Sequence, residues 1–381
     1  MILWIDASNI RAGGGVTHLV ELLRAAKPIE YGFTQVHLWA SQATLDKIED
    51  NEWLVKKHSD VLEKNFLHRA VWQKWTLSNE IKDSNAQVLF VPGGSFATSF
   101  RPVVTISQNL LPFMWGELRR YGLSLFTLKL LMLRFFQSRS FRNANGVVFL
   151  TKYAKDVVLK VSGRFLGEPR IIPHGIDARF ARVPREQYAP SYYSNDKPFK
   201  LLYVSIIDSY KHQWHVAHAV RILRKRGIPV SIDFVGPANP RYLDKLNGEL
   251  ALQGDGQYLN YLGAVPFNEL HQYYESADAF VFASSCENMP NILIEAMAAG
   301  LPIVCSQRGP MPEILGDAGI YFDPELPDSI ADAIATMFDS QQMRARIAEL
   351  AYEKSSQYSW HRCANETFSF LESIALSHRA N

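Results

Sequence analysis

Residues 279–304 read AFVFASSCENMPNILIEAMAAGLPIV, and this stretch decides the predicted fold. The opening apolar run, Ala279–Ala283, is typical of a buried strand in a parallel sheet. Pro290 is well placed as an early helical residue, because its fixed φ and missing N–H suit the first turn. The stretch therefore predicts a strand, a tight loop and a helix, with Glu287 at the mouth of the helix and Glu295 two turns inside it.

A helix that starts near Pro290 directs free backbone N–H groups and the positive end of its dipole into the space beyond the strand. Such a helix start is an anion site. A carboxylate beside it suits phosphate alone poorly, but it suits phosphates that are flanked by hydroxyl-rich sugars. The stretch therefore predicts a nucleotide-sugar as the ligand.

The same stretch resembles the family 4 retaining glycosyltransferases of the GT-B fold. Their C-terminal half carries two glutamates with seven residues between them, then Ala-Met-Ala-x-Gly-x-Pro, and this chain has each element up to Pro302. The resemblance implies that Glu287 contacts the donor sugar and that Glu295 binds the ribose hydroxyls. It also implies a donor-binding role for the residues that follow Glu287: Asn288, Met289, Pro290 and Asn291. Ordinary helix-start and surface glutamates are the alternative.

Length and composition fit two globular domains. The 381 residues allow a core in each, and a net charge of +2 gives no strong attraction to nucleic acid. Cys286, Cys305 and Cys363 match no metal-ligand spacing and suggest reduced thiols in a cytoplasmic compartment. We expect neither a signal peptide nor a membrane-spanning segment.

Apolar strands alternate with helical segments, which is the mark of doubly wound parallel sheets. Predicted strands are 2–6, 35–40, 88–91, 103–107 and 146–150, then 200–204, 230–235, 279–283 and 302–305. Two Rossmann-like domains follow, and the resemblance implies that they face each other across the active-site cleft. We place an acceptor-side domain at 1–175 and a nucleotide-sugar domain at 176–358. The helical segment 359–381 either crosses back to the first domain or is an ordinary terminal helix.

Three glycines, Gly13, Gly14 and Gly15, follow the first strand and precede a helix predicted over 16–26. Glycines at such a turn let the backbone approach a ligand and expose N–H donors. A dinucleotide fingerprint is disfavoured, since His18 stands where a third glycine is required. In the family, a Gly-Gly loop here faces the donor diphosphate, and the resemblance implies that role for these glycines.

The loop at 205–213 reads SIIDSYKHQ. The family has an arginine here and, five residues later, a lysine, and both neutralise the departing diphosphate. Lys211 matches the lysine, but Ile206 stands at the arginine position. Cations and amides stabilise charge that develops on a leaving group, so more of this task falls to Lys211, with Arg308 as a candidate to compensate. A solvated surface lysine is the alternative for Lys211.

Gln108 and Asn109 stand where many family members have histidine, beside the reacting sugar, and aspartate. These amides exchange hydrogen bonds with hydroxyls but do not titrate near neutral pH. The resemblance implies a reaction on one face of the sugar, in which the donor phosphate takes the acceptor's proton. Polar loop residues without a role are the alternative.

We expect no metal and no other cofactor. His212, His215 and His218 recur every three residues, and this spacing drifts around a helix instead of converging on one ion. The sequence also lacks the Asp-x-Asp pair that holds a cation in the other major glycosyltransferase fold.

The segment 117–142 carries six basic residues against one acid, Glu117, interleaved with Leu, Phe and Met. The basic residues are Arg119, Arg120, Lys129, Arg134, Arg139 and Arg142. One interpretation is a core-facing helix with a solvated basic side. The other is a helix that lies in the surface of an anionic membrane, where a lipid-carried acceptor is met.

The sequence therefore predicts a retaining, metal-independent transferase that moves a hexose or deoxyhexose from a nucleotide-diphosphate sugar to a hydroxyl of a glycan or lipid-linked glycan. Residues 210–213 and 287–291 are most similar to enzymes of bacterial surface-polysaccharide and lipopolysaccharide synthesis. The expected place is the cytoplasm, at the inner face of the membrane. A GT-B nucleotide-sugar epimerase or hydrolase, a nicotinamide oxidoreductase and a nucleotide-sugar-binding protein without turnover are the alternatives.

Overall fold

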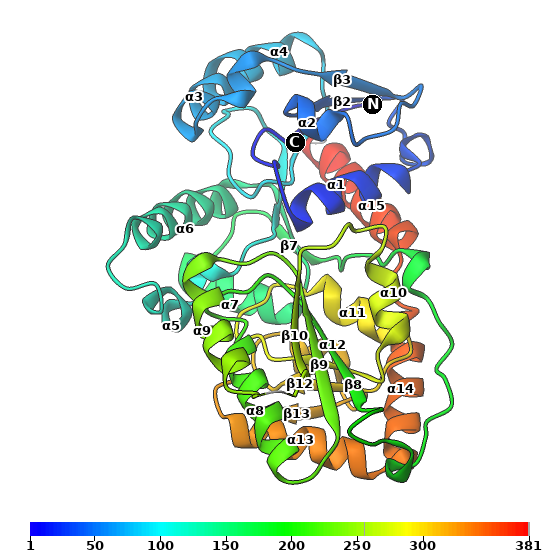
Figure 1. Ribbon diagram of the computed structural model, residues 1–381. Helices are drawn as coiled ribbons and strands as arrows, with labels where there is room; N and C mark the ends of the chain where they lie inside the picture. Colours follow the sequence, from blue (N-terminus) through cyan, green and yellow to red (C-terminus); the bar gives the residue numbers. More distant parts are fainter. Residues whose placement is uncertain (255, 380–381) are drawn as a thin grey trace. The chain divides into compact units, whose positions relative to one another are not determined.

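The computed structural model describes residues 1–254 and 256–379, and it divides the chain into two compact units (Figure 1). The first unit is Met1–Gly175 with Tyr358–Asn381, and the second is Ile176–Gln357. Each unit contains one sheet, in the orders β3-β2-β1-β4-β5-β6-β7 and β10-β9-β8-β11-β12-β13. All strand pairs in both sheets are parallel. The strand order reverses beside β1 and beside β8, so the two predicted doubly wound, Rossmann-like domains are confirmed.

The first sheet consists of β1 (Ile2–Asp6), β2 (Gln35–Trp39), β3 (Leu54–Lys57), β4 (Val88–Val91), β5 (Val103–Ser107), β6 (Gly146–Phe149) and β7 (Glu168–Ile171). The helices of this unit are α1 (Gly14–Arg24), α2 (Gln42–Leu45), α3 (Phe66–Trp72), α4 (Ser78–Asp83), α5 (Trp115–Arg119), α6 (Leu125–Asn143), α7 (Lys152–Ser162) and α15 (Trp360–Arg379). Shorter turns are η1 (Pro28–Tyr31), η2 (Asp60–Glu63), η4 (Leu111–Phe113) and the π-helical η3 (Gln73–Leu77), which joins α3 to α4.

The second sheet consists of β8 (Phe199–Val204), β9 (Val230–Val235), β10 (Leu259–Gly263), β11 (Ala279–Phe282), β12 (Ile303–Ser306) and β13 (Ile320–Phe322). Its helices are α8 (Gln213–Lys225), α9 (Pro240–Ala251), α10 (Leu270–Ser276), α11 (Asn291–Ala298), α12 (Met311–Leu315), α13 (Pro327–Asp339) and α14 (Gln341–Ser355), with short turns at η5 (Ala178–Phe180) and η6 (Pro190–Tyr192). The predicted strands of both units end within one residue of the observed ones.

Helix α15 belongs to the first unit, where it packs on α1, η1 and β4. Its Phe370 ring lies against Gly146, since a Cβ on that glycine would come within 2.7 Å of the ring. Gly175 packs as closely on the start of the helix, because a Cβ there would lie 2.2 Å from Trp360 N. The two segments that lead to and from the second unit therefore meet inside the first unit. Residues 380–381 of the predicted terminal helix lie outside the described residues.

Candidate active site

Strand β11 lies in the middle of the second sheet, between β8 and β12, and is buried along its whole length. Its loop leads into α11, whose N-cap is Pro290 and whose first helical residue is Asn291. The prediction that Pro290 lies inside the helix is thus wrong by one position, and Glu295 stands one turn inside the helix instead of two. Within the described residues no side chain caps this helix, and Asn291 Oδ1 is buried without a hydrogen-bond partner. These features leave the helix start open to an anion.

The loop after β8 approaches the loop after β11, because carboxyl ends of neighbouring parallel strands meet at one edge of a sheet. Lys211 Nζ from the first loop forms an ion pair with Glu287 Oε1 from the second. The side chains are only 7% and 13% exposed, and Lys211 Nζ also lies 5.3 Å from the centre of the Phe282 ring. Lys211 is therefore a buried cation and not a solvated surface lysine.

His212 ties these two loops together, a role that sequence analysis missed. It is the N-cap of α8, has a left-handed backbone (φ 53°), and its Nε2 shares a hydrogen bond of 2.9 Å with Ser285 Oγ. The backbone N–H of Ser285 also donates to Tyr210 O at 2.8 Å. These contacts fix Lys211, the residue between Tyr210 and His212, opposite Glu287.

Ile206 stands at the position of an arginine in the family, and Arg308 is the residue predicted to compensate for it. Ile206 is partly exposed, and its backbone oxygen accepts a hydrogen bond from Gln213 Nε2 at 2.8 Å. Arg308 donates to Asp323 at 2.9 Å and also pairs with Glu325. Arg308 is therefore already paired with two carboxylates, and its compensation for the missing arginine stays a prediction.

Glu295 is buried, and Tyr274 on α10 donates its hydroxyl to Glu295 Oε2 at 2.9 Å. Burial is the largest cause that raises the pKa of Glu295, and Asp177 also raises it, whereas the Tyr274 hydrogen bond and Arg179 lower it; the resulting pKa is about 7. A carboxyl in this range is partly protonated near neutral pH. An ionised Glu295 carboxylate would accept hydrogen bonds from two hydroxyls, whereas the protonated carboxyl accepts hydrogen bonds more weakly.

We predict from this pKa that donor binding weakens on acidification. A carboxyl with a pKa of about 7 loses its charge between pH 8 and pH 6, so affinity for a nucleotide-sugar falls about tenfold over that range if only the ionised form binds. Calorimetric titration with a nucleotide-sugar measures this, because its diphosphate diester does not titrate in that range. Glu295→Gln is the control and should bind with weak, pH-independent affinity. An equally flat profile for the wild-type protein would contradict the assignment.

The same pKa shift also affects folding stability, which falls as pH rises, whereas donor binding is predicted to strengthen. The folded state holds the Glu295 proton up to a pKa of about 7, whereas the unfolded state releases it near 4.5. The folded state therefore binds more protons in this window, and stability falls as pH rises through it. Glu295 thus contributes less to folding above pH 7, where its charge is available for a ligand.

In the first unit, Gly13 is the N-cap of α1 with φ 68°, and Gly14 and Gly15 are already helical, so the helix starts two residues before the prediction. A Cβ on Gly13 or Gly14 would meet no atom within 4 Å, which leaves room for close approach of a ligand. A Cβ on Gly15 would lie 2.9 Å from Gln108 Oε1, and Gln108 Nε2 is buried without a partner in the described structure. Gly15 and Gln108 are therefore neighbours.

Asn109 has a local structural contact instead, as its Oδ1 accepts a hydrogen bond from Leu111 N at 3.1 Å. The structure thus gathers the predicted residues in two groups. Gly13, Gly14, Gly15 and Gln108 lie in the first unit, and Lys211, Glu287, Asn291 and Glu295 in the second.

The rings of His212 and His215 stack 5.3 Å apart, but each of the three histidines has a different polar partner. His212 bonds to Ser285, His215 Nδ1 lies 3.1 Å from Pro324 O, and His218 Nδ1 lies 3.6 Å from Glu249. Across residues 1–254 and 256–379, no three His, Cys, Asp or Glu side chains are grouped to hold a metal ion. None of the described helices has the length and apolar character to cross a bilayer.

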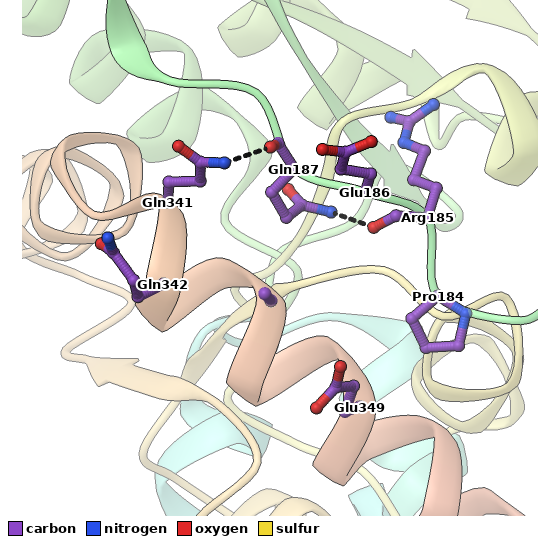
Figure 2. Close-up of a pocket in the computed structure, with 8 residues that line it drawn as sticks. Pro184, Arg185, Glu186, Gln187, Gln341, Gln342 and Glu349 are labelled. Carbon is purple, nitrogen blue, oxygen red and sulfur yellow. Dashed lines mark hydrogen bonds between the residues drawn. The ribbon is translucent and has the colours of Figure 1, made fainter.

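The second unit also has a hollow of about 370 Å³ lined by residues of the connection after η5 and by α14 (Figure 2). Gln341 Nε2 donates to Gln187 O at 2.7 Å, and Gln187 Nε2 donates to Arg185 O at 3.2 Å. The lining contains none of the predicted site residues. Its glutamines mainly hold the connection to α14, so we assign the hollow no part in the site.

Comparison with solved structures identifies the fold. Solved structures of HepE from Anabaena with UDP (18% identical, 98% of this chain and 100% of that chain, TM-score 0.69) and of WaaG, a glycosyltransferase involved in lipopolysaccharide biosynthesis (14%, 97% and 99%, TM-score 0.67), have the same fold. The chain is thus a two-domain protein of the GT-B fold. Residues 184–354 match the family model described as Glycosyl transferases group 1. The matched residues cover most of the second unit.

Curated relatives match only part of the chain. The O-antigen chain mannosyltransferase B of Escherichia coli is 34% identical over 110 residues, which are 29% of this chain and 29% of that protein. The chain spans about a third of the length of the first curated relatives that it matches.

Proposed function

We propose that this protein is a retaining glycosyltransferase that moves a hexose or deoxyhexose from a nucleotide-diphosphate sugar to a hydroxyl of a glycan or lipid-linked glycan. The observation that carries the proposal is the buried Lys211–Glu287 ion pair in the loops before the open start of α11. A cation and free backbone N–H groups suit a diphosphate, and carboxylates suit sugar hydroxyls. The match of the same unit to the group 1 family model supports this assignment.

In the proposed reaction, the bond between the donor sugar and its phosphate breaks, and negative charge grows on the departing diphosphate. Lys211 and the amides at Asn291 stabilise that charge, so turnover needs no metal. Glu287 contacts the sugar and holds Lys211 in place, and Glu295 binds the ribose hydroxyls. Asn288, Met289 and Pro290 line the donor site by the same resemblance.

The first unit contributes Gly13, Gly14 and Gly15 as amide donors and Gln108 as a hydrogen-bonding partner of the sugar. Because the Gln108 amide does not titrate, we assign removal of the acceptor's proton to the donor phosphate. This step leaves the new bond on the face that the phosphate occupied, which is the retaining outcome.

A role in surface-polysaccharide synthesis in the cytoplasm, at the inner face of the membrane, completes the proposal. It is supported by the printed functions of similar proteins, an O-antigen mannosyltransferase and a lipopolysaccharide glycosyltransferase. The proposal also includes contact of residues 117–142 with that membrane.

We expect one class of nucleoside diphosphate to stabilise the protein in a thermal-shift screen of UDP, GDP, dTDP, CDP and ADP and their sugars. Binding to the folded state in excess over Kd raises the unfolding free energy by about 2.7 kcal/mol at a hundredfold excess. NAD and NADP are the controls. If NAD alone raises the melting temperature, or if no nucleotide-sugar does so, the donor site is refuted.

Ile206 and Gln108 favour a second candidate, a nucleotide-sugar-binding protein without turnover, since both depart from the residues that assist the family's chemistry. Release of nucleoside diphosphate separates the candidates. A transferase releases it only with acceptor, a hydrolase or epimerase without acceptor, and a binding protein under neither condition.

A further inference from the structure

Large apolar side chains are exposed along the amino-terminal half of α6 and in the turn before it. Leu123 and Leu125 are fully or almost fully exposed, and Leu128, Leu131, Met132 and Phe135 are more than a third exposed. Of residues 122–136, all of them described, only Leu130 is buried. The core-facing interpretation thus holds only for the second half of α6, where Gln137, Ser138, Ser140 and Phe141 are buried.

A second element, which sequence analysis did not identify, lies next to α6. The rings of Phe66 on α3 and Phe136 on α6 are 5.3 Å apart, and Figure 1 shows both helices in the first unit. Beside that contact, Leu67, Val71 and Trp75 recur every four residues along α3 and η3, and each is at least 60% exposed. The exposed apolar surface therefore extends over two neighbouring elements.

The segments that form this surface are rich in basic residues, and Glu117 of α5 is buried and paired with Arg120. The sequence contains no Asp or Glu from Asn65 to Asn79 or from Leu118 to Lys155. Two exposed tryptophans each hold a basic partner, with Lys74 Nζ 5.2 Å from the Trp75 ring and the Arg119 guanidinium 5.4 Å from the Trp115 ring. Tryptophan beside a basic residue suits the boundary between acyl chains and headgroups.

We propose that α5–α6 and α3–η3 together form a docking surface for an anionic lipid bilayer. The apolar side chains enter the acyl boundary, while Lys74, Lys129 and Arg139 meet the headgroup phosphates. A second copy of the chain fits less well, because a twofold interface would bring the same basic residues face to face. The inference rests on the proposed function in one respect, since a lipid-linked acceptor would be reached at the bilayer surface.

Vesicle flotation of the full chain tests this surface. The wild-type protein should float with vesicles of phosphatidylglycerol and phosphatidylcholine in equal parts, remain unbound with phosphatidylcholine alone, and dissociate as salt is raised. Leu125→Ser with Phe135→Ser, and separately Leu67→Ser with Trp75→Ser, should each lower binding at least about tenfold. Leu252→Ser with Leu326→Ser, exposed leucines of the second unit, is the matched control and should bind as the wild type does.

All substituted side chains are exposed, so melting temperatures and nucleotide-sugar binding should stay unchanged in every variant. Failure of the wild-type chain to float, or flotation of the α6 and α3 variants as complete as that of the wild type, would overturn the proposal. So would a dimer in solution that these variants dissociate. If the wild-type protein binds no nucleotide-sugar, the proposed function is refuted, but the conclusion from vesicle flotation is unaffected.

Discussion

Replacement of Lys211 by methionine is expected to lower kcat by about 100- to 1000-fold, which is the usual effect of removing one preset donor from developing negative charge. Lys211 is paired with Glu287 in the loop before α11, and the arginine position of the family is occupied by Ile206. Arg308 is already paired with Asp323 and Glu325, so we expect most of this task to fall to Lys211. Initial rates of nucleoside diphosphate release with acceptor present measure the effect.

Two variants accompany this experiment. Lys225→Met removes an exposed lysine of the same unit and should leave kcat unchanged. Glu287→Gln should also lose most turnover, since Glu287 both contacts the sugar and holds Lys211. If Lys211→Met and Lys225→Met were equally active, Lys211 would have no role in the departure of the diphosphate.

Replacement of Gly236 by alanine is expected to damage both stability and the site. Gly236 has φ 143°, a conformation that L residues rarely adopt, and a Cβ there would lie 2.1 Å from Ser205 O. Ser205 opens the loop that carries Lys211, so the new methyl group must displace that loop. We expect a loss of at least about 2 kcal/mol in unfolding free energy from strain and overpacking, together with weaker donor binding.

Urea denaturation and donor titration of the Gly236→Ala variant check this expectation. Gly248→Ala is the matched control, because Gly248 lies inside α9 and a Cβ there would meet no atom within 4 Å. Alanine in such a helix stabilises by about 0.5–1 kcal/mol relative to glycine. Similar stabilities for the two variants would mean that the backbone at Gly236 relaxes freely.

The central strands of both sheets could be predicted because they are buried on both faces and therefore read as unbroken apolar runs. The strands missed are β3, β7, β10 and β13, which are the outer strands of the two sheets. Edge strands are covered less completely, so their sequences mix polar and apolar residues. β7 reads Glu-Pro-Arg-Ile and is exposed throughout, and no pattern in such a stretch signals a strand.

Part of the site could also be predicted from the sequence. Lys211 and Glu287 are 76 positions apart, and the resemblance to a family assigned both to the donor without predicting their ion pair. The roles of His212 and Tyr274 were not predicted, because they depend on partners on other elements, Ser285 and Glu295. The exposed stripe on α6 was ambiguous in sequence, since apolar residues occur on both its buried and its exposed face.

The most direct test of the central claim is NMR observation of a reaction between the nucleotide-sugar that stabilises the protein and a glycan or lipid-linked acceptor. We predict that the donor is consumed only when acceptor is present, and that the new glycosidic bond keeps the donor's anomeric configuration. An inverted product, or consumption of the donor at the same rate without acceptor, would contradict a retaining glycosyltransferase.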